Sequence, residues 1–167
     1  MLMPQLSTLP EAQRRLWPEL GSVPAAFALY GGTALALRIA HRRSDDFVAE
    51  HDQVQGMNLS VASLLDIAGS KAAVIQKRAE ARDYIDIDAL MRNGVDLPTV
   101  LAAGRAMYGG QFNPLVTLKA LSYFDDVPAL AQDVRARLSA AVRAVELSDL
   151  PVMQPLRQPA QPDGNGV

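Results

Sequence analysis

The chain has 167 residues, of which 49% are apolar, and a formal net charge of −2, so we expect one domain with a real core and no overall basic field for nucleic acid. The absence of cysteine excludes disulfides and thiolate metal sites, and two histidines, His41 and His51, are too few for a histidine-rich zinc site. No apolar run approaches the ~20 residues that span a bilayer, and the N-terminus lacks a signal-peptide pattern, so we expect a cytoplasmic protein without a membrane partner.

The N-terminal third of the chain predicts two short helices and one or two strands. Pro10–Leu20 is typical of a short helix, because one proline suits its first turn and a second proline limits it. An apolar run within Val23–Tyr30 indicates a buried strand, and Thr33–Ala40 indicates an amphipathic helix. Asp46–Val54 is polar and holds at most one short strand.

A helical region follows. An apolar pattern that begins at Asn58 or Ser60 and runs to Ile75 predicts a long helix, in which Gly69 is a weak point because glycine costs roughly 1 kcal/mol relative to alanine. Capping and periodicity signals predict further helices over residues 82–92, 97–107, 113–124 and 129–147. From Ser148 the composition rich in proline, glutamine and glycine predicts a disordered tail. We therefore expect an α+β, mostly α fold, with the strands first and about five or six helices after them.

A glycine pair, Gly31-Gly32, separates the expected strand from the expected helix, and Thr33 follows it. Glycines at the start of a helix let the backbone approach a phosphate and aim free N–H groups at it. The pattern therefore suggests a nucleotide site, and the alternative is an ordinary turn.

Two adjacent carboxylates, Asp45 and Asp46, follow Ser44 one short helix downstream. Phosphoryl transfer uses a divalent metal to neutralise the triphosphate and to activate the attacking hydroxyl. Adjacent residues of a strand point to opposite faces, whereas Glu50 and Asp52 have the i, i+2 spacing that places two carboxylates on one face. The alternative is a solvated acidic turn after a basic hinge.

The segment KAAVIQKRAEARDYID carries cations and carboxylates at helical spacings. In one continuous helix, Lys71, Arg78 and Arg82 would fall within roughly 20° of one line, because each residue turns about 100°. Such a face suits a triphosphate, and Asp83 and Asp86, spaced i, i+3, would orient the cations or cap a turn. The alternative is a surface helix with ordinary ion pairs.

Three separated segments together resemble one family. The first is FALYGGTALALRIAHRRSDDF, which resembles the Gly-Gly-Thr-Ala-Leu motif followed by His-Arg-x-Ser and an acidic strand in the AbiEii/AbiGii toxins. These are abortive-infection toxins of the minimal nucleotidyltransferase superfamily. The second is SLLDIAGSKAAVIQKRAEARDYIDIDAL, which resembles a lysine-bearing helix followed by Arg, then Arg/Lys-Asp and a second Asp. The third is NPLVTLKALSYFDDV, which resembles the closing helical segment, so the resemblance covers roughly residues 10–126.

The resemblance implies magnesium-dependent transfer of a nucleotide from an NTP to an RNA, such as tRNA, or to a protein acceptor, and it implies a cognate antitoxin. Residues 1–57 would then be a truncated nucleotidyltransferase part with a sheet of roughly one to three strands, residues 58–147 the helical part and residues 148–167 the tail. The resemblance assigns phosphate binding to Gly31, Gly32 and Thr33, Mg²⁺ binding to Asp45 and Asp46, triphosphate contact to Lys71, support of the active-site helix to Asp83 and Asp86, and places in the substrate site to Ser44 and Arg78.

The chain departs from the family pattern in two places. The usual Ser-x-Asp-x-Asp is shortened to Ser44-Asp45-Asp46-Phe47. Family members also carry several dozen residues before the lysine helix, which supply central strands and a third carboxylate, whereas this chain has about a dozen (VAEHDQVQGMN). Glu50 and Asp52 are the candidates for that third ligand, and we interpret the chain as an internally truncated member.

Three functions are compatible with these patterns. The first is a working nucleotidyltransferase toxin. The second is a catalytically degenerate member that acts as a nucleotide- or partner-binding helical module. The third is a plain helical interaction module whose glycine pair is only a turn. Magnesium-dependent NTP binding distinguishes the first two from the third, and turnover distinguishes the first from the second.

Overall fold

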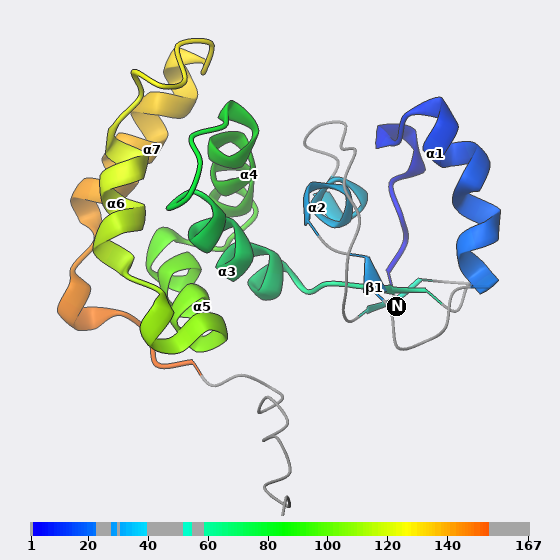
Figure 1. The fold of residues 1–167 in the computed structure, drawn as a ribbon, viewed down its shortest axis with the longest axis horizontal. Helices are drawn as coiled ribbons and strands as arrows, with labels where there is room; N and C mark the ends of the chain where they lie inside the picture. Colours follow the sequence, from blue (N-terminus) through cyan, green and yellow to red (C-terminus); the bar gives the residue numbers. More distant parts are fainter. Residues whose placement is uncertain (1, 23–27, 30, 40–51, 55–58, 154–167) are drawn as a thin grey trace, which may run out of the picture.

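The computed structural model describes residues 2–22, 28–29, 31–39, 52–54 and 59–153 (Figure 1). Most residues in these ranges are helical, which confirms the predicted mostly α class. The N-terminal elements are η1 (Leu6–Thr8), α1 (Glu11–Leu16), η2 (Trp17–Ser22), β1 (Ala28–Leu29), α2 (Gly31–Ile39) and β2 (Asp52–Gln53). The later elements are β3 (Ser60–Val61), α3 (Leu64–Val74), α4 (Ala81–Arg92), α5 (Leu97–Tyr108), η3 (Gly109–Gln111), α6 (Pro114–Ser122), α7 (Gln132–Ala144) and η4 (Leu147–Asp149).

The strands in the described residues form one small sheet in the order β1-β3-β2. β1 pairs with β3 in parallel, with Leu29 opposite Val61, and β2 pairs with β3 in antiparallel fashion. Each strand has two residues, and so short a ladder is marginal in water by itself. Leu29 and Val61 are both buried in the hydrophobic core, so the sheet depends on packing more than on its backbone hydrogen bonds.

The helix that follows the sheet begins later than the sequence predicts. The apolar pattern predicts a start at Asn58 or Ser60, whereas Ser60–Val61 form strand β3 and α3 begins only after Ser63. Ser63 sets this start, because its Oγ accepts the backbone N–H of Asp66 at 3.1 Å as a helix N-cap. The prediction of a helix from Asn58 or Ser60 is therefore wrong, since local capping and strand pairing outweigh apolar periodicity here.

The chain from Lys71 to Asp86 is not one helix, so the line of three cations, which the sequence allows only for a continuous helix, does not form. The two separate helices that the apolar pattern predicts here are confirmed. α3 ends at Val74 and α4 begins at Ala81. In a straight helix Lys71 and Asp83 would be about 18 Å apart along the axis, at about 1.5 Å a residue, which no side-chain contact bridges. Their 2.9 Å ion pair therefore requires the chain to turn between the two helices.

Helix α3 lies between α2 and the later helices, and it contacts α2, α4 and α5 (Figure 1). Its closest approach is to α5, where an added Cβ on Gly69 would lie 2.9 Å from the carbonyl carbon and oxygen of Ala103. Ala68 and Ala72 are buried on the same helix. Small side chains therefore let the two backbones meet, and Gly69 is a packing residue in an unbroken helix.

The last helices close the core against α4 and α5. Arg135 on α7 donates from Nε to the carbonyl of Leu130 at 2.8 Å and lies over the ring of Phe124. Leu150 is buried, so packing extends past Ser148, where the sequence predicts that the tail begins. Residues 154–167 lie outside the described residues, and the domain limits at 57 and 147 stay predictions. In the described part of the chain, no helix combines the length and the apolar character needed to cross a bilayer.

We predict that Gly69→Ala lowers the free energy of unfolding by about 1–3 kcal/mol, the usual cost of overpacking a filled core, although alanine is the better helix former by about 1 kcal/mol. The new methyl would collide with the backbone of Ala103, which cannot move aside as the end of a side chain can. Urea denaturation measures the difference. Gly110→Ala is the matched control, because nothing lies within 4 Å of a Cβ at that position. Equal stability of the two variants would contradict the tight α3–α5 packing.

Candidate functional site

A buried lysine joins helices α3 and α4 through two carboxylates. The Nζ of Lys71 lies 2.9 Å from Oδ1 of Asp83 and 2.7 Å from Oδ2 of Asp86. The lysine side chain is 6% exposed, and both aspartate side chains are 0% exposed. The structure thus brings together three of the residues that the sequence predicts for the site.

Asp83 is shared between two cations. Its Oδ1 accepts a hydrogen bond from Lys71, and its Oδ2 accepts one from Nε of Arg78 at 3.1 Å. Asp83 also lies in the first turn of α4, where the helix dipole favours a carboxylate. We call Lys71, Arg78, Asp83 and Asp86 the charge cluster. It holds two cations and two carboxylates, so it is formally neutral.

Arg82 stands apart from the predicted face of three cations. Its Nε pairs with Glu80 at 2.6 Å, and Glu80 also pairs with Arg78 at 3.2 Å. The side chains of Arg78, Arg82 and Glu80 are 38–41% exposed, and ion pairs of this exposure contribute little to stability. Arg78, Arg82 and Glu80 form the exposed rim of the charge cluster. Their ion pairs are the ordinary surface pairs that the sequence analysis gives as the alternative.

The glycine turn, Gly31–Thr33, forms the first turn of α2. Gly31 has a φ of 64°, a left-handed conformation that favours glycine. Gly32 and Thr33 are buried. The backbone at position 31 thus gives a physical reason for glycine there, and phosphate binding by this turn stays a prediction.

The predicted metal ligands Asp45 and Asp46, together with Ser44, lie outside the described residues. Glu50 also lies outside them, and Asp52 is described only as part of the backbone of β2. Within the described ranges, no three histidine, aspartate or glutamate side chains come together to hold a metal ion. The magnesium site therefore stays a prediction.

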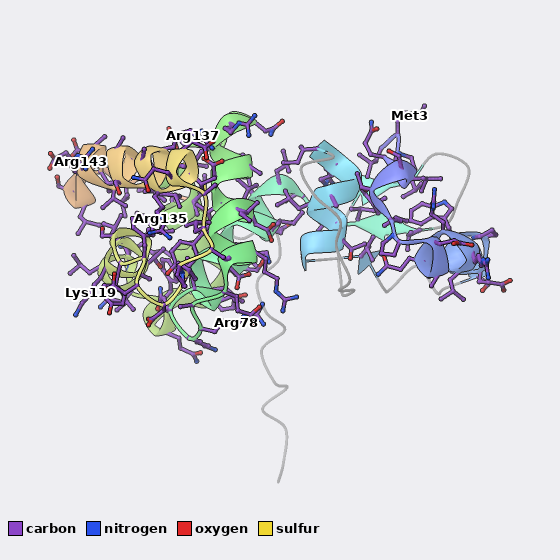
Figure 2. All side chains as sticks on the ribbon, turned by 90° about the horizontal axis from the view of Figure 1, so that it is seen from above. Met3, Arg78, Lys119, Arg135, Arg137 and Arg143 are labelled. Carbon is purple, nitrogen blue, oxygen red and sulfur yellow. The ribbon has the colours of Figure 1, made fainter. Side chains whose placement is uncertain are left out.

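A second ion pair, which the sequence analysis misses, joins α4 to α7, and it buries the carboxylate while the arginine stays partly exposed. Arg137 donates from Nε to Oδ1 of Asp88 at 2.6 Å and from Nη2 to Oδ2 at 2.9 Å, a bidentate pair. The hydrogen bonds from Arg137 to Asp88 and Asp133 raise the pKa of its guanidinium, and Arg137 in turn lowers the pKa of Asp133. Arg137 and Arg78 lie far apart in Figure 2, so this pair is separate from the charge cluster.

Tyr84 is a second residue that the sequence analysis leaves without a role. It is buried, and its hydroxyl lies 3.2 Å from the carbonyl oxygen of Ala120 on α6. Burial raises the pKa of the Tyr84 phenol, and the charges of Asp126 and Asp83 raise it further. Tyr84 therefore stays neutral and fixes α6 on the helix that carries both aspartates of the cluster.

An open hollow of about 510 Å³ lies at the turn between α5 and α6, and it is lined by Arg105, Gly109, Gly110, Phe112, Asn113 and Pro114. No residue of the predicted site lines it. The first N–H groups of α6 are not available to a ligand. Those of Leu115 and Val116 donate to the side chain and to the carbonyl of Asn113, both at 3.0 Å. The charge cluster therefore remains the candidate site.

We predict that Lys71→Met alone lowers the free energy of unfolding by about 3–5 kcal/mol, because it removes the ammonium that lies between the two buried carboxylates of Asp83 and Asp86. The double variant Lys71→Met/Asp86→Asn restores neutrality, since Asp83 keeps Arg78, and we expect it to recover most of the loss. Urea denaturation of the two variants and the unmodified chain makes the comparison. A Lys71→Met variant as stable as the unmodified chain would show that the ion pairs do not hold α3 to α4.

One comparison with known proteins finds a match. Residues 47–157 match the family described as the nucleotidyl transferase AbiEii toxin of a type IV toxin–antitoxin system. The matched region includes Lys71, Asp83 and Asp86, and it begins after the glycine turn and Asp46. No curated protein and no solved structure shows significant similarity to the chain. Because the match covers well over half of its length, the chain belongs to the AbiEii nucleotidyl transferase toxin family.

Proposed function

We propose that this chain is the toxin of a toxin–antitoxin pair and transfers a nucleotide from an NTP to an RNA or protein acceptor in the presence of Mg²⁺. The observation that supports this proposal most is the buried ammonium of Lys71, which lies between two carboxylates of the next helix. The family supports a nucleotidyltransferase-like role and an antitoxin partner. The proposal goes beyond the family in naming an NTP as the donor, an RNA or protein as the acceptor and Mg²⁺ as the metal.

Lys71 has the donors that a triphosphate needs. An ammonium carries three N–H donors, and within the described residues Lys71 uses one on Asp83 and one on Asp86. The remaining N–H is available to a phosphate oxygen. The two carboxylates fix the direction of the ammonium in advance, and a preorganised charge in a water-poor site stabilises developing negative charge better than a mobile one.

In the proposed reaction, a hydroxyl oxygen of the acceptor attacks the α-phosphorus of the NTP. A new bond forms between that oxygen and the α-phosphorus, and the bond from the α-phosphorus to the bridging oxygen breaks. Pyrophosphate leaves with the electron pair of the broken bond as negative charge on its oxygen. The hydroxyl proton goes to solvent or to a carboxylate. Lys71 then contributes by binding the triphosphate and by stabilising negative charge on the leaving group.

Asp45 and Asp46 would hold Mg²⁺, because carboxylate oxygens are the donors that this hard cation prefers. The bound ion would supply positive charge against the phosphate oxygens and would lower the pKa of the attacking hydroxyl. Gly31 and Gly32 would present backbone N–H groups to the phosphates at the start of α2, with Thr33 beside them, and Ser44 and Arg78 would complete the substrate site.

We predict that the purified chain incorporates label when it is incubated with Mg²⁺, one of the four labelled NTPs and total tRNA, with label followed into RNA and into the protein itself. Chelation of Mg²⁺ and the variant Asp45→Ala/Asp46→Ala should both abolish incorporation, because the proposed metal ligands are lost. Equal incorporation by the double variant would contradict the metal site. Magnesium-dependent binding of an NTP without incorporation would favour the degenerate, binding-only alternative.

We also predict that Lys71→Met/Asp86→Asn loses at least about tenfold in NTP affinity while it stays folded, since an ionic hydrogen bond is worth about 1.5–3 kcal/mol. The matched control is Asp88→Asn/Arg137→Met, which removes another ion pair between two helices with the same change of charge, away from the cluster. Equilibrium dialysis with labelled NTP measures both. Equal affinity of the two double variants would show that Lys71 is structural.

A further inference from the structure

Arg38 extends from the last turn of α2 to the strand that leads into α3. Its Nε donates to the carbonyl of Ala62 at 2.6 Å, and its Nη2 donates to the carbonyl of Val61 at 3.1 Å. The residues that these bonds join are 24 and 23 positions apart in the chain. One guanidinium therefore ties helix α2 directly to the end of β3.

The same end of β3 is held from the other side of the glycine turn. The backbone N–H of Ala62 donates to the carbonyl of Leu29 at 2.7 Å, and Leu29 lies opposite Val61 in the parallel pairing. Leu29 comes shortly before the glycine turn, and Arg38 lies in the last turn of the helix that the glycine turn begins. The segment Val61–Ala62 is thus bonded to the chain on both sides of the glycine turn.

Helix α3 begins immediately after this segment. The Oγ of Ser63 accepts the backbone N–H of Asp66 at 3.1 Å and donates to Oδ2 of Asp66 at 2.6 Å. These two hydrogen bonds in the first turn fix the direction in which α3 leaves the sheet. Lys71 lies two turns further along, roughly 10 Å from the start of the helix. The position of Val61–Ala62 therefore sets where Lys71 lies relative to the glycine turn.

The small sheet makes this side chain important. Each of its strands has two residues, so the backbone ladder offers few bonds between the N-terminal elements and α3. The planar guanidinium presents several N–H groups in a fixed geometry and reaches two successive carbonyls at once, which a lysine ammonium on a flexible stem does poorly.

We infer that Arg38 is a positioning residue, which holds the glycine turn against the helix that carries Lys71 and so sets the nucleotide affinity of the site. This inference rests on the proposed function. Arg38 acts through the backbone of Val61 and Ala62, and its loss lets the two parts of the proposed site move apart.

The first measurement is equilibrium dialysis of Mg²⁺ and each labelled NTP against Arg38→Met, Arg38→Lys and the control Arg14→Met, which removes an exposed arginine from α1. We expect Arg38→Met to bind about tenfold or more weakly, as small misplacements of binding groups do, Arg38→Lys to fall between, and Arg14→Met to equal the unmodified chain. Unchanged affinity in Arg38→Met would overturn the inference.

The second measurement is independent of nucleotide. The chain has no cysteine, so Ala12→Cys on α1 and Lys77→Cys after α3, both exposed, accept a unique pair of spin labels. We expect Arg38→Met to broaden or shift the distance distribution between the labels, and Arg38→Lys to restore part of it. Lower thermal stability with an unchanged distribution in the folded protein would overturn the inference, because it would show a merely stabilising role.

The two measurements separate this inference from the proposed function. If the unmodified chain binds no NTP, the proposed function fails, and the spin-label distances alone then decide whether Arg38 sets the position of α3. If Arg38→Met does not fold, Arg38→Lys takes its place, and wild-type affinity with a wild-type distribution in that variant would overturn the inference.

Discussion

The ion pairs of Lys71 with Asp83 and Asp86 are the interaction on which the helical region depends. They join α4 to α3, the helix that also contacts α2 and α5. An ammonium and two carboxylates lose their hydration when buried, and a buried pair is often no more stable than well-packed apolar residues of the same volume. Arg78 makes the burial tolerable because it balances the second carboxylate. Stability alone is therefore a weak reason for these charges, and under the proposed function they would orient Lys71 toward an anion.

The region that matches the family is mainly the helical region of the chain. The matched residues 47–157 include the whole charge cluster and the helices that surround it. The glycine turn precedes the match and is joined to that region by two-residue strands. Apolar packing of α2 on α3 and a few hydrogen bonds together determine how the two parts of the proposed site lie, and Arg38 supplies two of those bonds. In this short sheet, the side chain of Arg38 adds hydrogen bonds between α2 and the end of β3 that the backbone of a longer sheet would supply.

Local signals predicted much of the fold, and long-range contacts account for what they missed. Asp96 and Asn113 were recognisable as the starts of α5 and α6 because a cap bonds within its own turn, as both do here. The family resemblance singled out Lys71, Asp83 and Asp86, whereas their types and spacing alone were equally typical of ordinary ion pairs on a surface helix. Apolar periodicity also predicted the end of α3 and the start of α4 to within about a residue, but it misplaced the start of α3. It also hid strand β3, whose pairing partner Leu29 lies far away in the sequence. Asp88 and Arg137, 49 residues apart, leave no local pattern at all.

The neutrality of the charge cluster constrains any nucleotide mechanism built on it. Two cations and two carboxylates cancel, so the cluster by itself attracts a triphosphate, which is highly negative, only through one oriented N–H. The two exposed arginines of the rim are already paired with Glu80. Under the proposed function, positive charge for the phosphates would come from outside the cluster, and a divalent cation on Asp45 and Asp46 would be one source. In that arrangement Lys71 would orient the triphosphate and the metal would supply most of the attraction, so we expect nucleotide affinity to depend more steeply on Mg²⁺ than on salt.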